Sequence, residues 1–166
     1  MILTLSSMVG AHKKGQALVD DYVGRLTAAS DSAKQLARQP RVYFEEWDEP
    51  MISAIRWVSE LIGYAGGTDC FPELGAQSHG KNRIIADPQT VIDANPDIII
   101  GSWCGKKFRP EKVCTRPGWD VISAVEHDQL HEIKSPYILQ PGPAALTDGL
   151  EQLQAIIHRW SNAQTS

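Results

Sequence analysis

Cys104 is the side chain in this sequence with the clearest potential for nucleophilic chemistry. It follows the apolar residues 98–100 within Gly101-Ser102-Trp103-Cys104-Gly105, where a buried strand would end. In the strand-end elbow of hydrolases the nucleophile stands midway between two glycines, and here that central residue is Trp103. A cysteine nucleophile also needs a base, and no spacing designates one among His79, His127, His131 and His158. We therefore expect no catalytic residue and no enzyme, and we keep a small α/β enzyme or redox sensor that uses Cys104 as an alternative.

The cysteines do not form a recognised metal or disulfide pattern. Cys70, Cys104 and Cys114 are an odd number without a Cys-x-x-Cys pair, so neither a structural zinc site nor a disulfide framework is indicated. One disulfide bond between two of them stays open. Neither Gly-x-Gly-x-x-Gly nor the P-loop pattern occurs, so nothing indicates nucleotide binding. We expect no metal site and no intrinsic cofactor.

Length and charge restrict the class of protein. With 166 residues, of which 42% are hydrophobic, the chain is long enough for one domain with a proper core. A net charge of −4, without a basic run interleaved with aromatic residues, argues against nucleic acid as a partner. No apolar stretch approaches the roughly 20 residues of a membrane helix. Residues 1–5 are too short and too uncharged to form a signal peptide.

Residues 98–100, followed by Gly101, predict a buried central strand. They are uniformly apolar and leave no polar face for a half-exposed strand. Strand-like residues 41–44 and 130–133 alternate with helical stretches, which is typical of a parallel sheet with right-handed crossovers. We therefore predict an α/β fold: a three-layer Rossmann-like lobe with a mostly parallel central sheet, preceded by a long helix over residues 11–37.

The segments between these strands give further expectations. Residues 45–50 predict an acidic, aromatic loop, and residues 51–64 predict a helix that ends at Gly66-Gly67. Residues 73–83 predict a loop long enough to be functional, and the proline-rich residues 135–143 predict a rigid loop. Short helices are expected over residues 87–94, 109–113 and 118–122, and a final helix carries the apolar stripe Leu146, Leu150, Leu153, Ile157 and Trp160.

Aromatic and polar side chains follow the predicted strands. The carboxyl ends of parallel strands form the ligand crevice of open α/β sheets, so these side chains are expected to share one edge. Large flat side chains with few hydrogen-bonding groups suit a bulky, partly apolar ligand. The pattern therefore favours binding over catalysis, through Trp47, Ser102, Trp103, Phe108, Tyr137 and Gln140.

Several segments, taken in order, resemble the cobalamin-type branch of the helical-backbone (class III) substrate-binding proteins of ABC transporters. The resemblance covers about residues 40–160. The segments that carry it are Val42-Tyr43-Phe44-Glu45-Glu46-Trp47-Asp48-Glu49-Pro50, Trp57-Val58-Ser59-Glu60-Leu61-Ile62 with Ala65-Gly66-Gly67, Asn95-Pro96-Asp97-Ile98-Ile99-Ile100, Ser102-Trp103-Cys104-Gly105-Lys106 and Gln140-Pro141-Gly142-Pro143.

The resemblance implies a bilobal protein with two α/β lobes, one long connecting helix, and ligand held between the lobes. Residues 1–39 align with the N-terminal segment and connecting helix, and residues 40–166 align with the C-terminal ligand-binding lobe. We expect the N-terminal lobe to be absent from this chain, so that a missing lobe or a second chain supplies the other wall. The implied function is capture of cobalamin or a related corrinoid for an importer, without chemistry. Haem and a ferric siderophore are alternative ligands, and an interaction domain that pairs with a second chain is a third interpretation.

The same resemblance assigns ligand contacts by position. They are Trp47, Asp48, Glu49, Trp57, Arg83, Ser102, Trp103, Cys104, Tyr137 and Gln140. For Trp57 the alternative role is packing in the core. For Cys104 or His79 the alternative role is direct ligation of the cobalt ion.

The resemblance also implies an ABC permease as partner and a periplasmic location, with a cytoplasmic one left open. The glutamate with which the family docks on its permease is replaced here by Gln89. Docking is therefore expected to be lost or to use a neighbour such as Asp87.

Overall fold

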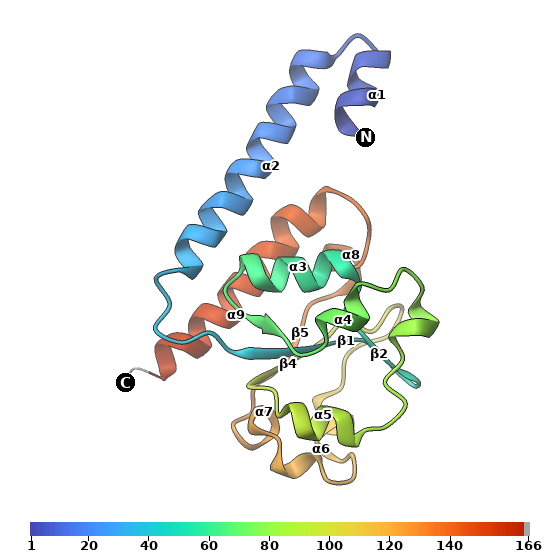
Figure 1. The fold of residues 1–166 in the computed structure, drawn as a ribbon, viewed down its shortest axis with the longest axis vertical. Coiled ribbons are helices and arrows are strands. Elements are labelled where there is room, and N and C mark those ends of the chain that lie inside the picture. Colours follow the sequence, from blue (N-terminus) through green and yellow to red (C-terminus); the bar gives the residue numbers. More distant parts are fainter. Residues whose placement is uncertain (165–166) are drawn as a thin grey trace.

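The computed structural model describes residues 1–164, and these contain a five-stranded sheet. Four strands run parallel in the order β3 (Thr68–Asp69), β1 (Arg41–Asp48), β4 (Ile98–Gly101) and β5 (Leu130–Glu132). The fifth, β2 (Met51–Ser53), pairs antiparallel with the end of β1 that β3 leaves free. The sheet lies between two layers of helices (Figure 1), which confirms the predicted three-layer α/β lobe with a mostly parallel sheet.

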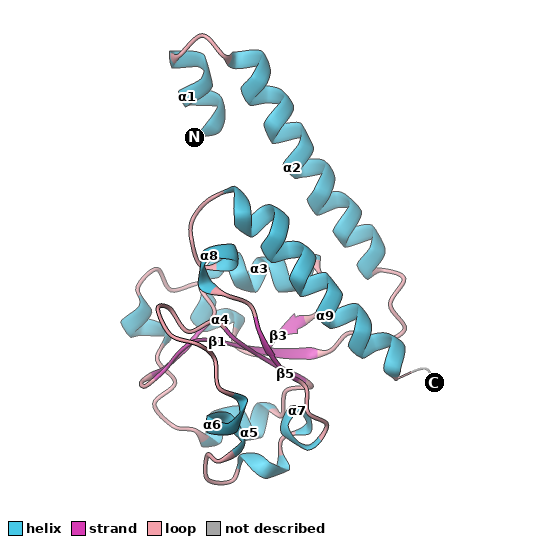
Figure 2. Cartoon of the chain, turned by 180° about the vertical axis from the view of Figure 1, so that it is seen from behind, coloured by secondary structure: helices cyan, strands magenta, loops and turns pink. Residues whose placement is uncertain are grey.

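Helices cover both faces of the sheet (Figures 1 and 2). One face carries α3 (Arg56–Tyr64) and α9 (Leu150–Ala163), and the other carries α5 (Gln89–Ala94), α6 (Pro110–Cys114), the short helix η2 (Trp119–Val121) and α7 (Ser123–Glu126). The predicted short helices of this second layer are therefore confirmed. Burial of both faces explains why the parallel strands are apolar throughout rather than alternating.

The central strand β4 shows how one apolar run serves two cores. Ile98 and Ile100 pack with α3 and α9, whereas Ile99 packs with Trp119 and Val91 on the opposite face. All three side chains are fully buried. Because successive side chains of a strand point to opposite faces, an all-apolar sequence is required at this position.

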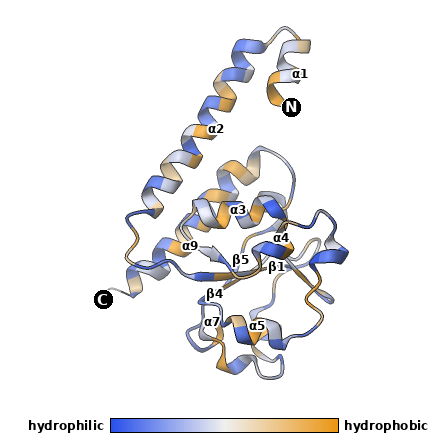
Figure 3. Ribbon diagram, in the orientation of Figure 1, coloured by the Kyte–Doolittle hydropathy of each residue, from blue (hydrophilic) through white to orange (hydrophobic). Residues whose placement is uncertain are grey.

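The long helix is present as α2 (His12–Ala33). It ends a few residues before the predicted end, and its second half contacts α3. A short helix, α1 (Ile2–Met8), packs against its first half. Both helices extend beyond the lobe (Figure 1), and Figure 3 shows hydrophobic stretches on them. Leu5 of α1 and Val23 of α2 are exposed. Among residues 1–164, no helix combines the length and apolarity that crossing a membrane requires.

The largest departure from the sequence prediction is the hairpin of β1 and β2. Residues 45–48, predicted as a loop, continue β1, and residues 51–53, predicted as the start of a helix, form β2. Trp47 pairs with Ile52 and Asp48 with Met51 across the ladder. Cross-strand pairing and the burial of Met51 and Ser53 outweigh the helical spacing of this segment. The helix α3 begins only at Arg56 and closes, as predicted, at Gly66, whose φ is +96°.

Short helical turns replace two of the predicted loops. The segment 73–83 contains most of α4 (Pro72–Gly75) and η1 (Gly80–Arg83), and the proline-rich segment contains α8 (Ser135–Ile138). The final helix is preceded by one π-helical turn, η3 (Ala145–Gly149). The predicted apolar stripe of α9 is confirmed as core, since Leu150, Leu153 and Ile157 are almost fully buried.

Candidate functional site

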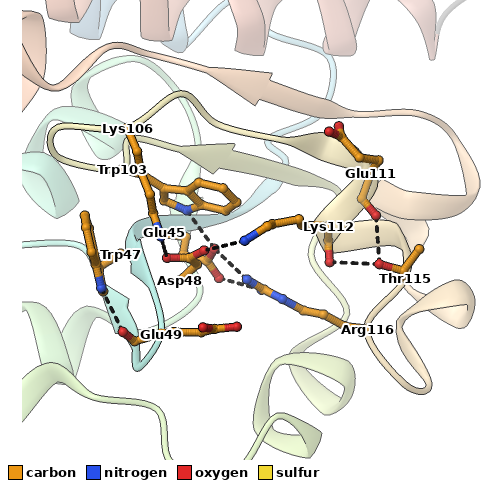
Figure 4. A network of polar contacts seen from close by, with 10 residues as sticks. All are labelled: Glu45, Trp47, Asp48, Glu49, Trp103, Lys106, Glu111, Lys112, Thr115 and Arg116. Carbon is orange, nitrogen blue, oxygen red and sulfur yellow. Dashed lines mark hydrogen bonds and ion pairs between the residues drawn. The ribbon is translucent and has the colours of Figure 1, made fainter.

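The carboxylate of Glu45 is the centre of a buried network at the carboxyl end of β1 (Figure 4). It accepts two hydrogen bonds from the Arg116 guanidinium, at 2.6 and 2.9 Å. It also accepts one from Trp103 Nε1 at 2.9 Å and one from Tyr43 Oη at 2.9 Å. Four donors therefore satisfy a carboxylate that has no solvent exposure, and they join β1 to the segments after β4 and α6.

The network shifts the pKa values of Tyr43 and Arg116. Burial raises the pKa of Tyr43 well above its ordinary value, and the adjacent Glu45 charge raises it further. Burial alone would lower the pKa of Arg116, but the hydrogen bonds and charge of Glu45 outweigh it and the net direction is upward. At neutral pH Tyr43 is therefore a neutral phenol and Arg116 a cation.

Trp47 and Trp103 form an aromatic pair around the ammonium of Lys106 (Figure 4). Lys106 Nζ lies 4.2 Å from the ring centroid of Trp47 and 5.1 Å from that of Trp103. The same nitrogen contacts Asp48 Oδ1, while Lys112 Nζ lies 3.9 Å from Asp48 Oδ2. The Asp48 side chain is only 3% exposed, so its charge is balanced almost entirely by these two lysines. We call Trp47, Trp103 and Asp48 the cation cage.

An open cavity of about 590 Å³ lies beside this cage at the carboxyl ends of β4 and β5. It has one aromatic wall, Trp103, and a surface with more basic than acidic groups. Its lining consists of Trp103, Gly105, Lys106, Lys107, Glu132, Lys134, Ser135 and Pro136. The position matches the crevice that open α/β sheets use for ligands.

Comparison with known proteins identifies the family. The family model described as periplasmic binding protein matches residues 1–137. The chain belongs to the periplasmic binding protein family. Since this is a family of binding proteins, the prediction of a non-enzymatic protein is confirmed.

One curated relative of this periplasmic binding protein is YvrC of Bacillus subtilis (strain 168), an uncharacterized ABC transporter substrate-binding lipoprotein. The two are 26% identical over 159 residues, which cover 90% of this chain and 46% of YvrC. The chain thus spans about half the length of the curated relative it matches.

Solved structures share the fold at low identity. A possible iron-binding periplasmic solute-binding protein from Staphylococcus epidermidis has a TM-score of 0.79 and 19% identity, covering 95% of this chain and 60% of that chain. IsdE of S. aureus, complexed with heme, has a TM-score of 0.78 and 16% identity, covering 95% and 62%. The vitamin B12 binding protein BtuF of Vibrio cholerae has a TM-score of 0.71 and 20% identity, covering 99% and 60%.

The other residues predicted to contact ligand in this periplasmic binding protein lie in several different environments. Trp57 lies in a different place from the cage: its Nε1 donates to Ile138 O at 2.9 Å, and its ring lines a second cavity of about 320 Å³. That cavity lies between α2, α3 and the turn before α9, with Leu26, Tyr64 and Pro141 on its walls. Gln140, which directly precedes the cavity residue Pro141 in the sequence, is exposed.

Arg83 is a buried structural cation in this conformation. It is 2% exposed, and its guanidinium forms hydrogen bonds with both carboxylate oxygens of Glu46, at 2.6 and 3.2 Å. It also donates to the backbone oxygen of Ser53. These contacts attach the predicted long loop to the β1–β2 hairpin, and they leave Arg83 outside the lining of the strand-end cavity.

The other nominated residues lie near the strand ends with differing exposure. Ser102 is 1% exposed, whereas Cys104, Glu49 and Tyr137 are exposed. The backbone oxygen of Glu49 accepts a hydrogen bond from Trp47 Nε1 at 2.8 Å, so Glu49 helps to orient that indole. Tyr137 follows the cavity residues Ser135 and Pro136 on α8.

Sequence reasoning missed Glu45 and Arg116 as organisers of the site. Glu45 carried a detectable signal, since it directly follows the buried strand residues Val42, Tyr43 and Phe44. A carboxylate in such a strand needs buried donors. Arg116 carried none, because only the tertiary structure brings its loop to β1.

Among residues 1–164, no group of three or more His, Cys, Asp or Glu side chains is arranged to hold a metal ion. The three cysteines are free thiols. Burial, followed by the charge of Asp69, raises the pKa of Cys70 to about 12. Cys104 and Cys114 are exposed.

Proposed function

We propose that this chain is a ligand-binding lobe of the substrate-binding component of an ABC importer, and that it captures a metal chelate and passes it on without bond chemistry. Membership of the periplasmic binding protein family supports the binding role, and YvrC supports the association with an ABC transporter. The fold relatives include a possible iron-binding protein, a protein complexed with heme and a vitamin B12 binding protein, and these support the class of ligand. The lipoprotein relative supports a location outside the cytoplasm.

The observation that carries the proposal is the cavity at the carboxyl ends of β4 and β5, with Trp103 as its wall. Trp47 lies against the same lysine as Trp103, so both indoles belong to one rim. A flat macrocycle is recognised by apolar contact with a few polar groups. Trp103 and Pro136 are the apolar side chains of the cavity lining, and lysines are its main polar groups. We therefore propose contact with ligand through Trp47, Trp103 and Tyr137, with Asp48 and Ser102 behind them.

Cobalamin or a related corrinoid is the ligand that we propose first. Haem or a ferric siderophore is the second candidate, because Lys106, Lys107 and Lys134 give the cavity a basic lining that suits carboxylate-bearing chelates. The two candidates differ in charge, so they can be separated by direct titration.

We also propose that a second lobe or a second chain completes the site. The strand-end cavity is open, and ligand held by one wall alone would stay largely hydrated. For the permease we propose contact near the start of α5, where Asp87 is exposed and its carboxylate accepts a hydrogen bond from Gln89 N at 2.9 Å.

The test is titration of the purified chain with hydroxocobalamin, haemin and a ferric siderophore while tryptophan fluorescence is followed. A corrinoid site predicts saturable quenching by hydroxocobalamin that is lost in Trp103→Phe and retained in Trp160→Phe, since Trp160 is a core residue of α9. Quenching by haemin or the siderophore alone selects the second candidate. If none of the three quenches, the proposed function is wrong.

A further inference from the structure

The Lys106 ammonium occupies the cation cage as the ammonium group of a bound ligand would. Two indole rings face it at 4.2 and 5.1 Å, and the nearly buried carboxylate of Asp48 contacts it. The lysine reaches the cage from the loop between β4 and α6, and its side chain is 37% exposed. Two members of the cage, Trp47 and Asp48, lie on β1, and the third, Trp103, lies in the same β4–α6 loop as Lys106, at the edge of the open cavity.

The chemistry of the cage favours a cation over a neutral group. The faces of indole rings carry negative electrostatic potential and attract ammonium groups. Asp48 adds a full negative charge. If a neutral group replaced Lys106, the buried carboxylate of Asp48 would keep only one nearby cation, Lys112, whose Nζ lies 3.9 Å away. A group that replaces Lys106 without loss of stability must itself be positively charged.

We propose that Trp47, Trp103 and Asp48 form a subsite for an alkylammonium group of the ligand, and that Lys106 fills it in the free chain. When ligand enters the adjacent cavity, its ammonium takes the place of Lys106, which moves into solvent. As a ligand subsite this assignment rests on the proposed function. Among the ligands proposed above it selects a ferric siderophore with an amino or quaternary ammonium substituent, because cobalamin and haem carry no such group.

The experiment uses butylammonium chloride as the probe and Lys106→Ala as the variant with an empty cage. Tryptophan fluorescence is recorded during titration, with sodium chloride at equal ionic strength and n-butanol as matched controls. Lys106→Ala should give a saturable change with butylammonium in the millimolar range and none with n-butanol. The unmodified chain should need a concentration about tenfold higher or more, because the tethered Lys106 competes.

Two further variants make the result specific. Adding Asp48→Asn to Lys106→Ala should weaken butylammonium binding by about tenfold or more, since the ion pair is lost. Lys107→Ala removes a neighbouring lysine and keeps Lys106 in the cage, so it should bind the probe no better than the unmodified chain. If Lys106→Ala fails to fold by circular dichroism, Lys106→Gln takes its place.

Equal binding of n-butanol and butylammonium, or no saturation in a folded Lys106 variant, overturns the subsite. The probe contains no metal chelate, so this outcome is independent of the chelate titration. A chain that binds butylammonium but no chelate contradicts the proposed function and leaves the cage as a cation site.

Discussion

Arg116 and Glu45 form a bidentate ion pair in which Nη1 and Nη2 donate to the two carboxylate oxygens at 2.6 and 2.9 Å. Glu45 is completely buried, and the Arg116 side chain is 17% exposed. The guanidinium also lies 4.4 Å from the ring centroid of Trp119, in the core between the sheet and the second helical layer. The pair thus fixes the segment after α6 to the strand that carries Trp47.

We predict that Glu45→Gln or Arg116→Met lowers the free energy of unfolding by about 3–5 kcal/mol, because each leaves the other partner buried without its countercharge. Urea unfolding followed by circular dichroism measures this loss. The double variant should lose less than the sum of the single variants. Arg109→Met, a change of an exposed cation just before α6, should stay within about 0.5 kcal/mol, and an equal loss there would refute the assignment.

Gly101, the last residue of β4, is predicted to tolerate no side chain. A Cβ at this position would lie 1.9 Å from Phe108 Cδ2, and the Phe108 ring packs edge-on against Trp103. Gly101→Ala should therefore destabilise the fold by about 1–3 kcal/mol and displace the aromatic wall of the cavity. Gly63→Ala in α3 is the control: nothing lies within 4 Å of its Cβ position, so its greater helix propensity should leave stability unchanged or raised. Thermal unfolding of both variants compares them directly.

Asp48 is predicted to make stability depend on pH in the acid range. Burial alone would raise the pKa of Asp48, but the hydrogen bond and charge of Lys106, with the charge of Lys112, outweigh it and lower the pKa below its ordinary 3.8. A lowered carboxylate pKa contributes stability above 3.8 that is lost as the pH falls through the folded-state value. Asp48→Asn should therefore be less stable than the unmodified chain at neutral pH, and the difference should shrink as the pH falls below 3.8. Urea unfolding over this pH range is the measurement, and a difference that stays constant would contradict the role of the charge.

The cysteines are predicted to differ in reactivity. The pKa of Cys70 is raised to about 12, first by burial and then by the charge of Asp69, whereas Cys104 and Cys114 are exposed. Because the thiolate is the reactive form, a raised pKa alone slows alkylation of Cys70 near neutral pH by about a thousandfold. Iodoacetamide labelling with peptide mapping should modify Cys104 and Cys114 in the folded chain, and Cys70 only after unfolding in urea. Rapid labelling of Cys70 in the folded chain would contradict both the burial of its thiol and its raised pKa.

The sequence was sufficient for the fold and for part of the site. Residues 98–100 and the glycine after them located the central strand, and the spacing of Leu150, Leu153 and Ile157 located the last helix. The same rules failed at residues 45–53, where helical spacing competed with strand pairing and lost. A short strand in a hairpin depends on the partner across the ladder, and local spacing does not specify that partner.

What the sequence by itself determined is the alternation of strands and helices, and hence an edge at which Trp47 and Trp103 meet, because parallel strands present their carboxyl ends together. Tertiary structure alone decided that Lys106 lies between these rings, that Arg83 is buried against Glu46, and that Trp57 lines a separate cavity. The physical reason is that apolar periodicity is a local property. The partner of a buried charge is chosen by whichever distant loop the folded chain brings within hydrogen-bonding distance.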